Sequence, residues 1–98
     1  MNIEAAELRE RVSAREDLRI LDVRDELEFH TFNLGGLNVP LGKIREAEDV
    51  DFGTGEEIIV VCQHGVRSRT ACALLRSMGF TNTRNLVGGL LALRRLNS

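Results

Sequence analysis

Aromatic residues and surplus positive charge are scarce in this chain of 98 residues. It has four phenylalanines, no tyrosine and no tryptophan, and 13 basic residues stand against 15 acidic ones for a net charge of −2. Nucleic-acid binding usually requires a basic surface with rings on which bases stack. The composition therefore argues against a nucleic-acid partner.

Long apolar runs are also missing. The longest, IIVVC and LLAL, are far shorter than the roughly 20 residues that a membrane span requires, so no membrane partner is expected. The first residues, MNIEAAELRER, are charged and lack the apolar stretch of a signal peptide. We therefore expect a soluble, cytoplasmic protein.

Cysteine is rare as well. Cys62 and Cys72 form neither a disulfide framework nor a CxxC redox or zinc pair, which fits a reducing compartment. No other ligand lies at a metal-site spacing from His64, so neither a metal nor a cofactor is expected.

The length allows one hydrophobic core, and we expect a single domain over residues 1–98. Strand patterns occupy 18–23, 37–39, 57–62 and 83–87, and the strand over 57–62 has the strongest signal and should be central. Helices are expected over 3–12, 26–32, 67–78 and 90–96, with a helical turn around 44–47. Asn2 suits the cap of the first helix, and Asp25 with Glu28 forms a capping-box pattern at the second.

This alternation predicts an α/β fold with a parallel sheet and helices on both faces. In such sheets the ligand site lies beyond the carboxyl ends of the strands. Cys62 occupies that position, at the start of the stretch CQHGVRS between a strand and a helix. Backbone N–H groups in such a loop converge on one point, and Gly65 permits the backbone conformation that the loop needs. We therefore predict that Cys62 is a nucleophile with a lowered pKa.

The other polar residues near this loop allow more than one interpretation. A lone cysteine is often only core packing, which is the favoured interpretation for Cys72 but not for Cys62. His64 could act as a base or ligand, although a loop histidine more often only hydrogen-bonds its surroundings. Arg67 could contact a bound anion or brace the loop against an acid such as Asp22, and the sequence leaves both open.

Four stretches together resemble the rhodanese-like single-domain sulfurtransferases: LDVRDELEF, NVPL, VVCQHGVRSRTACALLRSMGF and NLVGGLLAL. The resemblance implies a rhodanese-like α/β fold with a parallel sheet of about five strands and helices on both faces. It also implies that Cys62 carries a transient persulfide, with the sulfur held by the substrate-binding loop: Gln63, His64, Gly65, Val66, Arg67 and Ser68. The partners would be a small donor such as thiosulfate, polysulfide or a persulfide, and a cyanide, thiol or protein acceptor.

The sequence departs from that family in three places. FNLGGLNVP stands where the family has GHIPGAINIP, Leu93 replaces a common tryptophan, and Gln63 and Val66 offer no cation to a doubly charged donor. Two rival functions remain. One is a phosphatase, although related phosphatases have Cys-X5-Arg where this chain has Cys-X4-Arg. The other is a sulfur-carrier or redox-sensing docking module with little activity on small donors.

Overall fold

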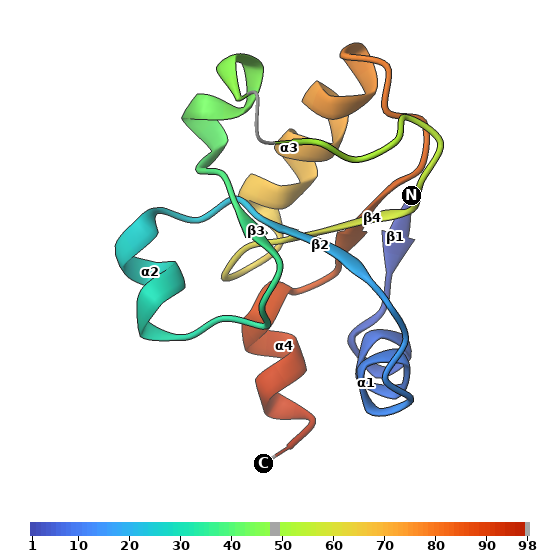
Figure 1. Cartoon of the computed structure of the whole chain (residues 1–98). Coiled ribbons are helices and arrows are strands. Elements are labelled where there is room, and N and C mark those ends of the chain that lie inside the picture. Colours follow the sequence, from blue (N-terminus) through green and yellow to red (C-terminus); the bar gives the residue numbers. More distant parts are fainter. Residues whose placement is uncertain (48–49, 98) are drawn as a thin grey trace.

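The computed structural model describes residues 1–47 and 50–97. The strands are β1 (Asn2–Ile3), β2 (Arg19–Asp22), β3 (Leu37–Asn38), β4 (Ile58–Val61) and β5 (Thr83–Leu86). The helices are α1 (Ala5–Ser13), α2 (Glu26–Thr31), the 3₁₀ helix η1 (Leu41–Glu46), α3 (Val66–Ser77) and α4 (Gly89–Arg95). All strands are parallel, in the order β1-β5-β4-β2-β3 (Figure 1). The predicted parallel α/β architecture is confirmed.

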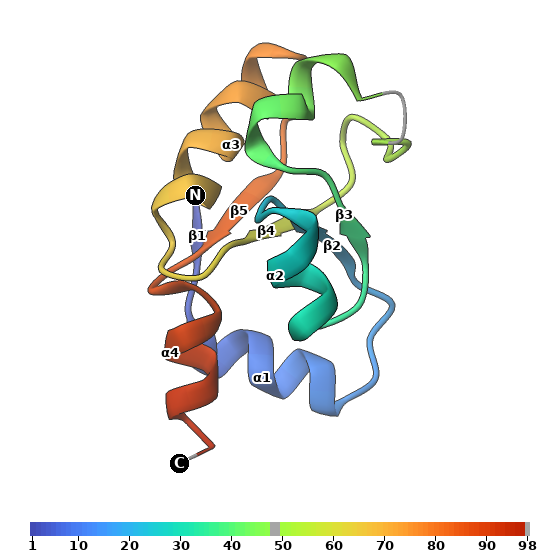
Figure 2. The same ribbon diagram turned by 90° about the vertical axis from the view of Figure 1, so that its left-hand side faces the viewer.

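Two hydrophobic clusters cover the two faces of the sheet. On one face, α3 and η1 pack over alternate residues of the central strands, such as Leu21, Ile58 and Val60. On the other face, α1 and α4 cover the residues between them, such as Ile59 and Val61 (Figure 2). Burial on both sides explains the apolar run of the central strand β4, whose four residues are all buried.

The strand β4 is central, as predicted, with β2 and β5 paired on either side. The register places Asp22 beside Val61, and the Val23 amide donates to the Val61 carbonyl at 3.0 Å. Parallel strands end at the same edge of the sheet. The segments that follow β2 and β4 therefore emerge together, which brings Arg24 and Cys62 to one end of the molecule.

The prediction for the N-terminus is wrong in one respect. Asn2 and Ile3 do not begin a helix, because they pair with Asn85 and Leu86 as a short edge strand. The first helix begins at Ala5, and its cap, Glu4, makes no side-chain capping bond. A sequence pattern does not reveal two residues of edge pairing, since β1 is too short to show alternation.

The capping box of α2 is confirmed. Asp25 accepts the Glu28 amide at 2.8 Å, and the Glu28 carboxylate accepts the Asp25 amide at 3.4 Å. After this helix, the Asn33 side chain donates to the Phe29 carbonyl and accepts the Gly35 amide, which shapes the segment that departs from the family pattern. A second departure, Leu93, is buried against the sheet and so fills space in the core.

A buried ion pair joins the end of β2 to α2. Arg24 donates from Nε and Nη2 to the two oxygens of Asp22 at 2.8 to 3.2 Å, and Nη2 also donates to the Phe32 carbonyl. Both residues of the pair are almost fully buried.

Along the described residues, no helix combines the length and apolar character needed to cross a membrane.

Replacing Arg24 with methionine should lower the free energy of unfolding by about 3–5 kcal/mol, because it leaves the Asp22 carboxylate buried without its cation. Urea denaturation measures this cost. Arg19→Met is the matched control, since Arg19 pairs with Asp17 at 3.0 Å on the surface and should cost only about 0–1 kcal/mol. Equal losses in the two variants would contradict this account of the buried pair.

Candidate active site at Cys62

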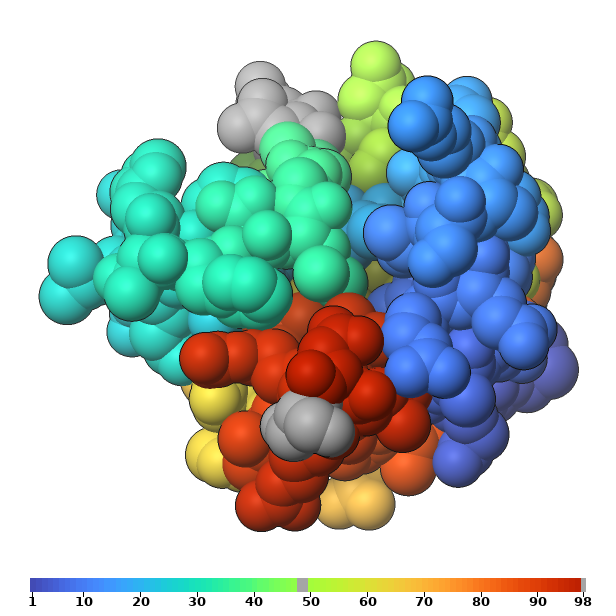
Figure 3. Space-filling view, turned by 90° about the horizontal axis from the view of Figure 1, so that it is seen from below, coloured from blue at the N-terminus to red at the C-terminus, as the bar shows by residue number. Residues whose placement is uncertain are grey.

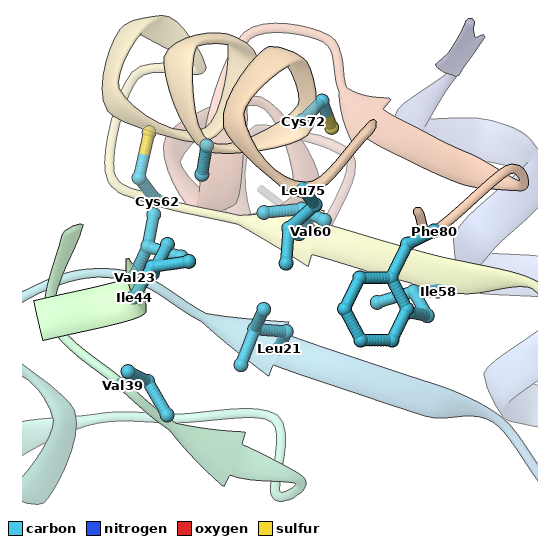
Figure 4. Close-up of a cluster of buried hydrophobic side chains, with 11 residues drawn as sticks. Leu21, Val23, Val39, Ile44, Ile58, Val60, Cys62, Cys72, Leu75 and Phe80 are labelled. Carbon is cyan, nitrogen blue, oxygen red and sulfur yellow. The ribbon is translucent and has the colours of Figure 1, made fainter. Parts of the chain in front are cut away.

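Cys62 directly follows the central strand β4. Its sulfur points away from the aliphatic side chains of Val23 and Ile44 and toward the loop at the start of α3 (Figure 4). The residue is only 1% exposed, yet its sulfur faces polar groups rather than hydrocarbon. Core packing alone does not explain this side chain.

Three hydrogen-bonding groups surround the Cys62 sulfur. The Gly65 amide lies 3.1 Å from Sγ, the Ser68 amide 3.3 Å and the Ser68 hydroxyl oxygen 3.2 Å. Gly65 immediately precedes α3 and has a φ of 90°, a left-handed conformation that glycine adopts without strain. The predicted need for a glycine at this position is confirmed. The left-handed conformation of Gly65 directs the amides of the loop toward the Cys62 sulfur.

These donors change the acidity of the thiol. Burial by itself would raise the pKa of Cys62, but the hydrogen bonds from the Ser68 hydroxyl and from the Ser68, Gly65 and His64 amides outweigh it and lower the pKa. Cys72 shows the opposite balance, since burial raises the pKa of its thiol and its main hydrogen-bond partner is Thr83. The fold therefore distinguishes the two cysteines, as the sequence predicted.

The Ser68 hydroxyl has one proton and two neighbours that can take it. Its oxygen contacts both the Cys62 sulfur and Oδ1 of the buried Asn85, to which it donates. While Cys62 is a thiol, the S–H can donate to Ser68 and the Ser68 O–H to Asn85. A thiolate can only accept, so the Ser68 hydroxyl stabilises it only when its proton turns from Asn85 to the sulfur. Stabilisation of the thiolate by Ser68 would therefore reverse the direction of this short chain.

Asn85 also fixes the backbone of the loop. Its Nδ2 donates to the Gly65 carbonyl at 3.2 Å from the neighbouring strand β5. Asn85 thus contacts the loop at two points, at Gly65 and at Ser68. It holds in place both the amide and the hydroxyl that contact the sulfur.

The start of α4 holds the other side of the loop. The Leu90 amide donates to the Cys62 carbonyl at 2.8 Å and the Leu91 amide to the Gln63 carbonyl at 3.1 Å. A Cβ on Gly89 would overlap both of these carbonyl groups, so only glycine allows this approach. The pair Gly88–Gly89 is therefore part of the site as well as a turn.

Arg67 braces the loop, but its partner is not Asp22. Its Nη1 and Nη2 donate to the two carboxylate oxygens of Glu28 on α2 at 2.7 and 3.0 Å. Asp22 is engaged by Arg24 instead. Of the two roles that the sequence left open for Arg67, the structure shows the bracing contact, with a different acid.

The remaining predicted residues line the rim. Gln63 is partly exposed, while His64 and Val66 are exposed. Within residues 1–47 and 50–97, no cluster of His, Cys, Asp and Glu has the geometry to hold a metal ion. Arg69 on α3 is exposed.

A groove of about 500 Å³ lies beside the loop, between α2 and α4. Figure 3 shows the surfaces of these two helices next to each other. Leu27 and Phe32 give the groove apolar walls, and the Arg94 guanidinium lies 5.1 Å from the centre of the Phe32 ring. Other lining residues are Arg24, Glu28, Thr31 and Gln63. Through Gln63, the groove is continuous with the loop that holds Cys62.

Sequence reasoning missed three residues of this site: Glu28, Asn85 and Gly89. Glu28 was recognised only as part of a capping box, and Asn85 only as part of a strand. Asparagine in a buried strand is itself a signal, because its amide needs partners. The choice of partner, however, depends on the register between β5 and the loop, which the sequence does not contain.

Comparison with known proteins identifies the family. The profile of the Rhodanese-like domain matches residues 4–95. The Bacillus subtilis protein named "Putative sulfurtransferase YtwF" is 31% identical over 92% of this chain and 86% of its own length. A crystal structure of a rhodanese-related protein from Thermoplasma volcanium has a TM-score of 0.80 at 28% identity, covering 97% of this chain and 91% of that one.

This chain belongs to the rhodanese-like domain family. Another relative, the Bacillus subtilis protein named "Putative sulfur carrier protein YrkF", is 30% identical over 84% of this chain but 44% of its own length. The chain therefore spans less than half of that relative.

The alkylation rate of Cys62 should follow a titration with a midpoint below the ordinary thiol value, because the loop donors favour the thiolate. Ser68→Ala removes the hydroxyl donor and should move the midpoint upward. Iodoacetamide labelling against pH, read by mass spectrometry in a Cys72→Ser background, measures both. Thr70→Ala on the same helix is the control. An unchanged midpoint in Ser68→Ala would show that the hydroxyl does not stabilise the thiolate.

Proposed function

We propose that the protein is a sulfurtransferase that moves sulfane sulfur from a donor to a thiophilic acceptor through a persulfide on Cys62. The observation that carries this proposal is the set of loop donors around a buried sulfur, which favours an anion at that atom. The proposal takes residues 1–98 as one rhodanese-like domain that acts in the reducing cytoplasm.

The proposed reaction has two displacement steps. With thiosulfate as donor, the Cys62 thiolate attacks the sulfane sulfur, a bond forms between the two sulfurs, and sulfite leaves with the electron pair of the broken S–S bond. In the second step a cyanide or thiolate acceptor attacks the outer sulfur, and Cys62 leaves as a thiolate. In each step the attacking group supplies the electron pair of the new bond, and the leaving group keeps the pair of the broken bond. The transfer of the sulfur atom therefore needs no external oxidant or reductant.

The loop can serve both steps. In the persulfide the negative charge sits on the outer sulfur, one bond beyond Sγ. We propose that the backbone amides from Gln63 through Ser68 hold that atom in the concave loop, with α3 adding the positive end of its dipole. Side chains of the loop then matter less than its shape, and His64 needs no proton-transfer role in this scheme.

A sulfur-carrier or redox-responsive docking role is the second candidate. It is supported by the low exposure of Cys62, which limits access by free donors, and by the name of the relative YrkF. In this role a partner protein would deliver or collect the sulfur, and the groove between α2 and α4 would contact that partner. A phosphatase is less well supported, because Glu28 engages the guanidinium that would otherwise hold a phosphate.

Incubation with thiosulfate or inorganic polysulfide should add about 32 Da, the mass of one sulfur, to the wild-type protein. Intact mass spectrometry measures the adduct. It should be absent from Cys62→Ser and retained in Cys72→Ser, because only Cys62 has the thiolate-stabilising donors. Cyanide should then remove the adduct and release thiocyanate.

The outcome separates the candidate functions. An adduct that forms but turns over slowly with every small acceptor would favour the carrier role. An adduct that persists in Cys62→Ser would contradict the proposed site. Phosphatase action would instead appear as hydrolysis of p-nitrophenyl phosphate that is lost in Cys62→Ser.

A further inference from the structure

Arg67 is the one permanent cation in the loop sequence from Gln63 to Ser68. The hydrogen bond to Glu28 is the main cause that raises the pKa of Arg67, and the charge of a negative Cys62 adds a smaller rise, so the guanidinium and the sulfur interact. An anionic sulfur donor that approaches the loop would be attracted by this guanidinium if the charge were available. What Arg67 contacts therefore affects which donors the site accepts.

Glu28 holds Arg67 in a two-pronged ion pair. Both carboxylate oxygens are engaged, at 2.7 and 3.0 Å. The Arg67 guanidinium is the largest influence on this acid and lowers the pKa of Glu28 to about 2, so the carboxylate stays charged at any physiological pH. The same carboxylate also closes the capping box with Asp25, which fixes its position on α2.

Two other arginines line the groove beside the loop. Arg24 is matched by the buried Asp22 carboxylate, and Arg94 on α4 lies over the Phe32 ring. Arg94 is the same in every variant compared below, so it contributes equally to each. Leu27, which is 78% exposed, and Phe32 present hydrocarbon. Gln63 is uncharged. The ion pair between Glu28 and Arg67 thus decides whether the loop presents a cation to an incoming donor.

We propose that Glu28 is a specificity-determining residue: by neutralising Arg67 it makes the site discriminate against doubly charged donors such as thiosulfate in favour of donors with less charge. This inference deepens the proposed sulfurtransferase function and rests on it for the kinetic test below. Glu28 acts through Arg67 and does not touch the reacting sulfur. Its removal should change the ranking of donors more than the rate of the chemical step.

Two donors isolate the charge. Thiosulfate carries two negative charges, and methanethiosulfonate carries one with a methyl group in place of the second charged oxygen. Both give their terminal sulfur to the Cys62 thiolate, releasing sulfite or methanesulfinate with the bonding pair. Glu28→Gln should raise kcat/KM for thiosulfate relative to methanethiosulfonate by about two- to fivefold, mainly through KM, as expected for one exposed charge pair.

Two further variants serve as controls. Glu26→Gln removes the same charge from the first turn of the same helix at an exposed position. It should leave the donor ratio within error of wild type. The double variant Glu28→Gln/Arg67→Gln should lose the gain, because the released cation is gone. The gain in Glu28→Gln should also shrink at high salt, where exposed charges are screened.

A second measurement does not depend on sulfur transfer. Iodoacetate is an anion and iodoacetamide is neutral, and both alkylate the same thiolate. Glu28→Gln should raise the iodoacetate-to-iodoacetamide rate ratio at Cys62 by about two- to fivefold in a Cys72→Ser background. An unchanged ratio, or an equal rise in Glu26→Gln, would overturn the role of Glu28. Failure of every donor to form a persulfide, with the alkylation ratio still raised, would instead overturn the proposed function alone.

Discussion

Hydrogen bonding to a single buried sulfur is the interaction on which the rest of this site depends. Burial opposes a negative charge on Cys62, so the thiolate is favoured only where several donors converge on it. Two backbone amides and one hydroxyl meet this need at distances of 3.1 to 3.3 Å. A displacement of the loop by about one ångström would weaken these hydrogen bonds, while the cost of burying the thiolate would remain.

The surrounding fold can be understood as support for that loop. Strand β4 delivers Cys62 to the edge of the sheet, and β5 beside it carries Asn85, which contacts the loop at Gly65 and Ser68. The start of α4 approaches closely enough to bond the carbonyls of Cys62 and Gln63 because Gly89 has no side chain. The hydrogen-bond donors that contact the Cys62 sulfur are therefore held in place by Asn85 and by the start of α4. Their orientation is set before a sulfur-donor molecule binds.

The sequence was informative wherever the physics is local. Hydrophobic runs, the capping box of α2 and the strand–loop–helix junction at Cys62 depend on neighbouring residues, and all three were predicted correctly. Contacts between distant segments were not. For Arg67 the sequence left open contact with an anion or bracing against an acid such as Asp22. In the structure Asp22 pairs with Arg24, two residues later, and Glu28 pairs with Arg67. The sequence did not point to Glu28 as this partner, because the choice depends on how α2 packs against the loop.

The arginines around the site explain how its positive potential arises. Arg24 and Arg67 are each matched by a carboxylate, so their net contribution near the sulfur is small. The potential at Cys62 then comes mainly from peptide N–H dipoles and the start of α3, which act over short distances and in fixed directions. A cationic side chain attracts any anion from several ångströms away, and salt weakens this attraction. Converging N–H dipoles instead favour an anion only at the one position to which they point. A site of this kind suits a small anionic sulfur held at one point better than a tetrahedral dianion with its charge spread over several oxygens.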